Sequence, residues 1–311
     1  MSRPVGRVDP SLLDDAYCAA LLPERSRRSH KGSHGTLVCV CGSLDYAGAA
    51  LLCGTSAARA GVGLVALAVP AALQPYLAGR VPELVTLGLP DSTAEALATI
   101  EARQPHALVV GSGLAESERQ RELVLALLGR TGWRAVVDGG ALNLLAGLDE
   151  WPSRVIAECV LTPHPGEFAR LTGSPVGDDD DERAERCTEA ARRFGQVVVL
   201  KGARTVIAAP DGRLARAPFK NPALASAGTG DVLAGAIGSL LAQGLGPYDA
   251  ACLGVYLHGS AGERISERLG DSGLLASDLP LEMALVRRQL QRRREGKEAK
   301  VGFGRRESDA R

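Results

Sequence analysis

The chain has 311 residues, a formal net charge of zero and 4 % aromatic residues. This balance argues against a nucleic-acid-binding surface, and no apolar run is long enough to cross a bilayer. We therefore expect no nucleic-acid or membrane partner and a cytoplasmic location. The seven cysteines form no C-x-x-C pair, so they indicate neither a zinc site nor redox chemistry.

Short apolar runs alternate with longer amphipathic segments through the first half of the chain. The alternation follows an N-terminal segment, residues 1–24, with one short amphipathic stretch. Strands alternating with helices predict a mostly parallel sheet with helices on both faces, a three-layer α/β/α fold. The expected strands cover residues 36–42, 63–69, 84–87, 107–111 and 134–138, and the expected helices cover 49–60, 71–79, 92–103 and 116–129.

The second half continues the pattern and adds a hairpin. An acidic run at residues 178–182 is interpreted as a solvated loop and helix start. Residues 292–311 are charged and poor in apolar residues, so we expect a disordered tail after a single domain over residues 25–291. The other expected elements are helices over 182–194, 229–243, 248–268 and 279–291, a strand over 196–200, and a hairpin over 205–209 and 214–217.

The most informative segment is a turn of small residues that leads directly into an apolar helix. Gly228, Thr229 and Gly230 stand at the turn, and Asp231 falls in the first helical turn. The N–H groups at a helix start, together with the helix dipole, form an anion site. Asp231 is placed to take a proton from a hydroxyl that attacks a phosphoryl group. The alternative is that Asp231 only complements the helix dipole.

Unusual residues follow several of the predicted strands. In open parallel sheets, ligands bind beyond the carboxyl ends of the strands, so we expect these loops to meet at one rim. They are Gly42-Ser43, Gly111-Ser-Gly-Leu114, Asp138-Gly-Gly-Ala-Leu-Asn143, Leu161-Thr-Pro-His-Pro-Gly-Glu167 and Lys201-Gly-Ala-Arg-Thr205.

Two of these loops, within residues 161–167 and 200–206, carry a family resemblance together with the segment around the α-helix start, residues 221–235. They resemble the ADP-dependent NAD(P)H-hydrate dehydratases of the ribokinase-like superfamily, over about residues 22–288. The resemblance implies a ribokinase-like fold. It also implies dehydration of the hydrated (6S) form of NADH or NADPH. In that reaction ADP phosphorylates the ring hydroxyl, phosphate is eliminated, and AMP and phosphate are released.

The resemblance also implies roles for single residues. Asp231 would contact the damaged ring and act as the base. The anion hole would consist of Gly228, Thr229 and Gly230. The AMP portion of the nucleotide would contact Lys201, Gly202, Ala203, Arg204, Thr205 and Gly230.

The hydrated cofactor would also contact Ala49, Gly113 and His164. Without the resemblance, Ala49 and Gly113 are small packing residues, and His164 is as readily a hydrogen-bonded structural residue. Glu167 either caps the following helix or holds water on a metal. Arg59, Arg80 and Arg204 are candidates for contacting a 2′-phosphate, with no preference among them.

Two segments depart from the family pattern. Gly111-Ser-Gly-Leu-Ala115 stands in place of the usual Gly-Pro-Gly-Leu-Gly but keeps Gly113. Asp138-Gly-Gly-Ala-Leu-Asn143 lacks the second carboxylate of the usual Asp-Ala-Asp-Ala-Leu-Asn, so Asp138 and Asn143 have uncertain roles on the substrate side. A ribokinase-like kinase of a vitamin precursor or sugar is an alternative function, and a nucleotide-binding regulator without catalysis is another.

The resemblance further implies Mg²⁺ as cofactor, with ADP as phosphoryl-donor co-substrate. No metal ligands are assigned, because no carboxylate cage is visible and the nucleotide would hold the ion. We expect a homotetramer. A separate NAD(P)H-hydrate epimerase would act in the same pathway, because the chain contains no epimerase sequence.

Overall fold

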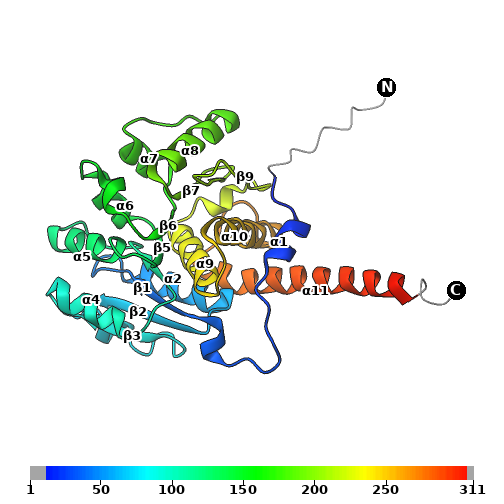
Figure 1. The fold of residues 1–311 in the computed structure, drawn as a ribbon, viewed down its shortest axis with the longest axis horizontal. Coiled ribbons are helices and arrows are strands. Elements are labelled where there is room, and N and C mark those ends of the chain that lie inside the picture. The colour runs from blue at the N-terminus through cyan, green and yellow to red at the C-terminus, as the bar shows by residue number, and fades with distance from the viewer. Residues whose placement is uncertain (1–11, 307–311) are drawn as a thin grey trace.

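The computed structural model describes residues 12–306, with side chains as far as residue 296. Its centre is a nine-stranded sheet in the order β3-β2-β1-β4-β5-β6-β7-β8-β9 (Figure 1). Strands β1 to β7 are parallel, and β8 and β9 are added antiparallel. The strands are β1 Thr36–Val40, β2 Leu64–Pro70, β3 Val85–Leu89, β4 Ala107–Val110, β5 Arg134–Val137, β6 Glu158–Leu161, β7 Val197–Leu200, β8 Val206–Ala208 and β9 Leu214–Arg216.

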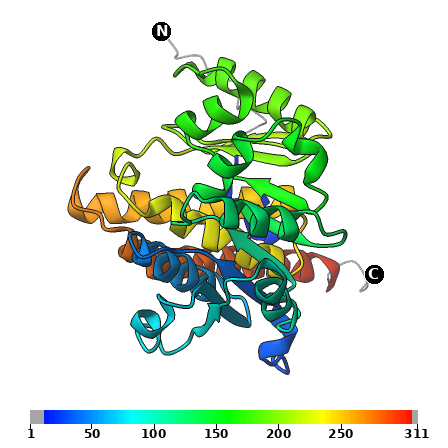
Figure 2. The same ribbon diagram turned by 90° about the vertical axis from the view of Figure 1, so that its left-hand side faces the viewer.

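Helices cover both faces of the sheet, as Figures 1 and 2 show. Alternate strand residues enter two separate hydrophobic clusters: Leu37 and Cys39 face α2, α9, α10 and α11, whereas Val38 and Val40 face α4 to α8. The helices are α1 Asp15–Leu21, α2 Ala47–Ala60, α3 Gln74–Leu77, α4 Thr93–Glu101, α5 Glu118–Leu128, α6 Gly140–Ala146, α7 Pro165–Thr172, α8 Asp180–Phe194, α9 Thr229–Ala242, α10 Pro247–Leu269 and α11 Leu279–Arg306. The predicted three-layer architecture, mostly parallel sheet and hairpin are confirmed.

Helix α9 is packed on nearly all sides, because small residues let its neighbours approach. A Cβ atom at Gly235 would lie 2.1 Å from the carbonyl oxygen of Cys53 in α2, and one at Gly238 would lie 2.4 Å from Val109 Cγ2 in β4. The apolar sequence of α9 therefore reflects burial between α2, α10 and the sheet. No helix of the described residues is long and apolar enough to cross a membrane.

Two segments differ from the sequence prediction. Residues 140–143, expected to be part of a loop, begin helix α6, because Gly139 adopts φ +52° and lets the chain turn straight from β5 into the helix. Residues 292–306, part of the tail expected to be disordered, continue helix α11 as far as Arg306. Residues 307–311 lie outside the described part.

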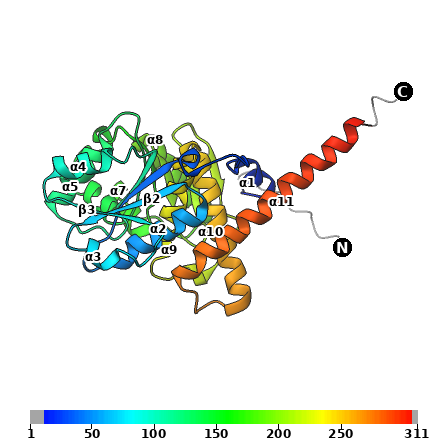
Figure 3. The ribbon, with the colours of Figure 1, turned by 90° about the horizontal axis from the view of Figure 1, so that it is seen from below.

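Contacts with the N-terminal segment explain the longer helix. Arg293 forms an ion pair with Asp15, and Arg294 Nη1 donates to the carbonyl oxygen of Leu22 at 2.8 Å. Leu290 is buried in the core cluster. Helix α11 continues beyond the body of the molecule (Figures 1 and 3). Residues 12–24 pack on the main body, and a domain boundary at residue 24 stays a prediction.

Candidate active site

The site is built around the first turn of α9. Gly228 caps this helix in the left-handed conformation, with φ +87°, and a Cβ there would lie 2.6 Å from Leu52 Cδ1. The Thr229 hydroxyl can donate to the carbonyl oxygen of Leu224 at 2.8 Å or of Ser226 at 2.9 Å, which holds the preceding turn in place. The N–H of Thr229 donates to the carbonyl oxygen of Ser226 at 3.4 Å, whereas the N–H groups of Gly230 and Asp231 have no partner within the helix.

A partly buried lysine, paired with a buried carboxylate, lies beside this helix start. Lys201 Nζ, at the end of β7, is 2.9 Å from Asp138 Oδ1, at the end of β5. A Cβ at Gly230 would lie 3.3 Å from the same Nζ atom, so the ammonium group lies against the first turn of α9. Glu167 Oε2 is 3.8 Å from Lys201 Nζ. The structure thus gives Asp138 a definite partner, which sequence reasoning missed.

Two hydroxyl groups fix the Asp138 carboxylate. Ser112 Oγ donates to Asp138 Oδ2 at 3.1 Å, and Thr162 Oγ1 donates to Asp138 Oδ1 at 2.7 Å. The side chain of Asp138 is 4 % exposed. Asn143 has other contacts: its amide nitrogen donates to Glu116, and its amide oxygen accepts from Arg170.

The environment of Asp231 favours a protonated carboxyl group. Burial is the largest cause and the Asp138 carboxylate the next; together with Glu167 they raise the pKa of Asp231 to about 7, against the lowering effect of Lys201 and Ser112. For Lys201, burial alone would lower the pKa, but Asp138 and Glu167 reverse the effect and raise it. The cluster therefore combines a permanent cation with a carboxyl group that titrates near neutrality.

His164 caps helix α7. Its Nδ1 accepts from the N–H groups of Gly166 at 3.0 Å and Glu167 at 3.3 Å, while Glu167 Oε2 accepts from the N–H of His164 at 2.7 Å. This reciprocal capping box confirms the capping interpretation of Glu167. Since Nδ1 accepts, the proton of the neutral ring is on Nε2, which is 3.4 Å from Glu167 Oε1.

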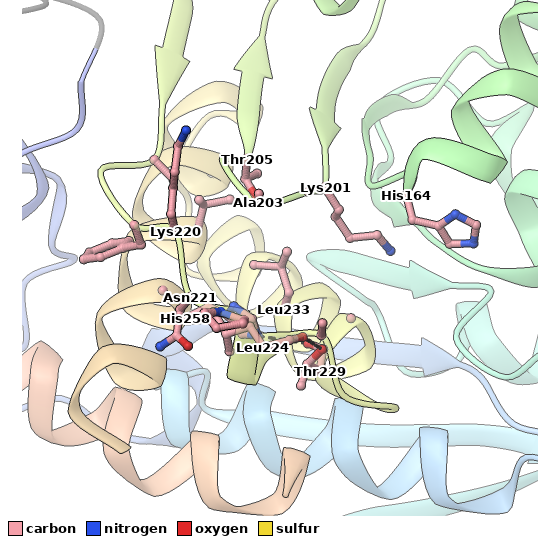
Figure 4. A pocket seen from close by; sticks show the side chains of 18 of the residues that line it. His164, Lys201, Ala203, Thr205, Lys220, Asn221, Leu224, Thr229, Leu233 and His258 are labelled. Carbon is pink, nitrogen blue, oxygen red and sulfur yellow. Dashed lines mark hydrogen bonds between the residues drawn. The ribbon is translucent and has the colours of Figure 1, made fainter. Parts of the chain in front are cut away.

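A cavity of about 630 Å³ opens beside Lys201 and the start of α9 (Figure 4). In Figure 4, Lys201 extends from the end of β7 towards the side where His164 lies. Among the residues predicted to hold the nucleotide, Arg204 does not line the cavity; its Nη1 is 3.4 Å from Asp180 Oδ2. The predicted residues that do line it are Lys201, Gly202, Ala203, Thr205, Thr229, Gly230 and His164.

Other lining residues were not predicted from the sequence. His258, inside α10, has Nε2 3.0 Å from the carbonyl oxygen of Thr229, and burial is the main cause that lowers its pKa to about 4. The ring is therefore neutral and donates this bond from Nε2. The side chains of Phe219, Leu224 and Leu233 form an apolar part of the cavity wall. Leu224 and Leu233 belong to the segment 221–235, but nothing in its pattern assigns these two side chains to a cavity wall, and Phe219 precedes that segment.

Ala49 and Gly113 lie together on the rim but do not line this cavity. Gly113 has φ +66°, and a Cβ there would lie 2.6 Å from Ala49 Cβ and 2.9 Å from the carbonyl oxygen of Tyr46. Close packing accounts for both small residues, so contact with a ligand is not needed to explain them.

The chain is similar to known proteins in sequence and in fold. The model of the NAD(P)H-hydrate dehydratase family matches residues 37–283. The chain belongs to this family. The ADP-dependent (S)-NAD(P)H-hydrate dehydratase of Bacillus subtilis is 37 % identical over 265 residues, which cover 85 % of this chain and 93 % of that protein.

A solved structure confirms the predicted ribokinase-like fold. The ADP/ATP-dependent NAD(P)H-hydrate dehydratase from Bacillus subtilis, co-crystallised with ATP and Mg²⁺, superposes with a TM-score of 0.78 at 33 % identity, covering 90 % of this chain and 98 % of that one. A bifunctional NAD(P)H-hydrate repair enzyme of Moorella thermoacetica is 42 % identical over 288 residues, 90 % of this chain. The chain spans 54 % of that relative, about half its length.

Proposed function

We propose that this family member is an ADP-dependent dehydratase that returns the hydrated (6S) form of NADH or NADPH to the intact cofactor. The observation that carries the proposal is the group of buried Asp138 and partly buried Asp231 and Lys201 at the start of α9, directly beside a cavity large enough for a nucleotide. The Bacillus subtilis relative, which this chain covers almost fully, bears the name of this activity.

Asp231 is proposed as the base. Its ionised carboxylate would accept the proton of the ring hydroxyl while that oxygen attacks the β-phosphorus of ADP, and the bond between phosphorus and the AMP oxygen would break. The N–H groups of the α9 first turn would stabilise the transferred phosphoryl group, and Lys201 would offset its negative charge. The lone pair of the ring nitrogen then expels phosphate, and loss of a proton from the neighbouring carbon restores the double bond.

The 630 Å³ cavity is proposed to hold the nucleotide. Its apolar wall at Phe219, Leu224 and Leu233 suits a base, and Lys201 and Gly230 lie at the end where phosphates would meet α9. Arg204 is proposed to act only through its ion pair with Asp180, since it does not line the cavity.

Mg²⁺ is proposed as a cofactor carried by the nucleotide. Within the described residues, no three or more histidine, cysteine or acidic side chains gather as a metal site. The oxygen atoms of the phosphates are ligands that Mg²⁺ prefers, and the ion would neutralise their charge. The chain's own contribution is to orient the phosphates with α9 and Lys201.

Three broader predictions stay proposals. A cytoplasmic location suits a chain whose cysteines are all free and buried in the described part. We propose a homotetramer, to be tested by light scattering. We also propose that a separate epimerase supplies the correct epimer, whereas the longer bifunctional relatives combine two repair activities in one chain by their name.

Product analysis distinguishes the dehydratase from a ribokinase-like kinase. Incubation with hydrated NADPH, ADP and Mg²⁺ should give AMP and inorganic phosphate in equal amounts. Phosphorus NMR can measure both products. A stable phosphate ester of an alcohol, formed in place of inorganic phosphate, would support the kinase. Binding of ADP with no turnover of any substrate would support a regulator.

A further inference from the structure

A second cavity lies far from Asp231, between the C-terminal end of α2 and helix α11. It has a volume of about 450 Å³ and shares no lining residue with the proposed nucleotide cavity. Helices α2 and α11 lie side by side (Figure 3). Ala49 and Arg59 are ten residues apart on α2, so this cavity is about 15 Å along the helix from the rim.

Four arginines line this second cavity: Arg25, Arg59, Arg287 and Arg294. None of its lining residues is acidic. Among the described residues, no carboxylate forms an ion pair with any of the four, although Arg293, next to Arg294, pairs with Asp15. The cavity is therefore a concentration of positive charge in a chain of zero formal net charge.

Capping of α2 explains part of this arrangement. Arg287 donates to the carbonyl oxygen of Ala60, and Arg25 donates to that of Gly61. Gly61 has φ +110°, and a Cβ there would lie 1.8 Å from Arg287 Nη1, so a glycine is needed for this close approach. Cations near a helix C-terminus are favourable, but each guanidinium has five N–H donors, and these contacts use few of them.

Arg294 donates to the carbonyl oxygen of Leu22, and Arg287 Nη2 also donates to Gln243 Oε1 at 3.4 Å, so Arg59 is the arginine that these contacts leave unexplained. Arg59 makes no hydrogen bond or ion pair within the described part of the chain. Burial, followed by the charges of Arg25 and Arg294, lowers the pKa of Arg287 to about 10. His34, near Arg25 and Arg287, is 8 % exposed and its Nε2 has no hydrogen-bond partner. A bound anion would relieve the repulsion among the arginines.

We propose that the cavity formed by Arg25, Arg59, Arg287 and Arg294 binds a small, multiply charged phosphate anion. Guanidinium groups match phosphate oxygens through paired N–H donors, and four of them around 450 Å³ suit a ligand with at least two negative charges. The site is distinct from the nucleotide cavity. Because α2 runs from the rim to this end, a ligand here would contact a helix that also packs, through Leu52, against Gly228 at the start of α9.

Calorimetric titration with sodium pyrophosphate at constant ionic strength tests the proposal. The wild-type chain should bind, and Arg59→Gln should weaken binding about tenfold, since one charge-assisted contact is lost. Arg59 has no protein partner to lose, so the variant should fold normally, which a melting curve checks. Arg288→Gln is the matched control, because Arg288 is an exposed arginine of α11 outside the cavity and its removal should leave binding unchanged.

Three results would overturn the proposal. The first is the absence of pyrophosphate binding by the wild-type chain. The second is equal weakening by Arg59→Gln and Arg288→Gln, which would indicate a general attraction of anions to basic surface. The third comes from Lys201→Ala. If Lys201→Ala abolished binding while Arg59→Gln had no effect, the anion would be in the nucleotide cavity, and the second site would be rejected.

Discussion

Asp231 is the residue on which the proposed chemistry depends. Asp231→Asn removes the base but keeps the shape of the side chain, so we expect kcat to fall about 10²- to 10⁴-fold while ADP still binds. Steady-state kinetics and ADP titration measure the two quantities. Asp249→Asn is the matched control, because Asp249 also lies in the first turn of a helix but far from Lys201. Near-normal kcat in Asp231→Asn would reduce Asp231 to a helix-dipole partner.

The raised pKa of Asp231 gives the enzyme a pH dependence. The carboxyl group must be ionised to act as a base, so kcat/KM should rise with pH through about 7. Lys201 lowers the pKa of Asp231, so Lys201→Ala should move the midpoint to higher pH and also raise the nucleotide concentration needed for half-maximal rate. A flat pH profile, or a midpoint that Lys201→Ala leaves in place, would contradict this electrostatic account.

The same shift should be visible in stability. Folding raises the pKa of Asp231 from its ordinary value of 3.8 to about 7, so the favourable contribution of the neutral form is complete below the lower value and is lost as pH rises through the higher one. Asp231→Asn cannot ionise. The free energy of unfolding of the variant, relative to that of the wild type, should therefore increase as pH rises towards 8. Denaturant titrations at several pH values can measure this difference.

At the scale of single elements, helix α7 offers a test of His164. Asparagine at a helix N-cap also accepts from backbone N–H groups, so His164→Asn should retain most of the stability, whereas His164→Ala should lose about 1 kcal/mol. If His164 only caps α7, His164→Asn keeps its activity. If it contacts the hydrated cofactor, both variants should show a raised KM for that substrate, and measuring KM decides between the two roles.

The start of α9 has a strict steric requirement. Gly228→Ala should cost about 1–2 kcal/mol for the left-handed backbone and should reduce activity, because the new Cβ meets Leu52 and displaces the phosphoryl-binding turn. Gly244→Ala is the matched control. Gly244 follows the same helix with φ +99° and has open space around it, so the variant should lose similar stability and keep its activity.

Equal losses of activity in the two glycine variants would show that Gly228→Ala lowers activity only by destabilising the fold. Thermal melts together with kcat at a temperature well below both transitions separate the two effects.

At the scale of the whole molecule, the sequence predicted the layers well because buried parallel strands are continuous apolar runs, as in Val197–Leu200. Helix α6 was missed because two adjacent glycines usually indicate a loop. The extent of α11 was missed because Arg293 forms an ion pair with Asp15, and Arg294 donates to the carbonyl oxygen of Leu22, near the other end of the chain. Such long-range contacts leave no local pattern.

The site was predicted only in part, because some of its contacts are also long-range and leave no local pattern in the sequence. Asp231 and Gly228 to Gly230 are adjacent in sequence and lie together at the helix start. The link between Asp138 and Lys201 spans 63 positions and exists only because β5 and β7 end at the same edge of the sheet. His258 reaches the cavity from inside an apolar helix, and only the fold shows that its face meets Thr229. Family resemblance supplied roles that spacing alone could not.

The most direct test of the proposed function is the recovery of dihydronicotinamide absorbance from hydrated NADPH by the purified chain with Mg²⁺ and ADP. We expect absorbance to rise, AMP to form in a 1:1 ratio with the restored cofactor, and Asp231→Asn to abolish both. Absence of any rise with either ADP or ATP, from a chain that melts cooperatively and binds nucleotide, would contradict the dehydratase assignment.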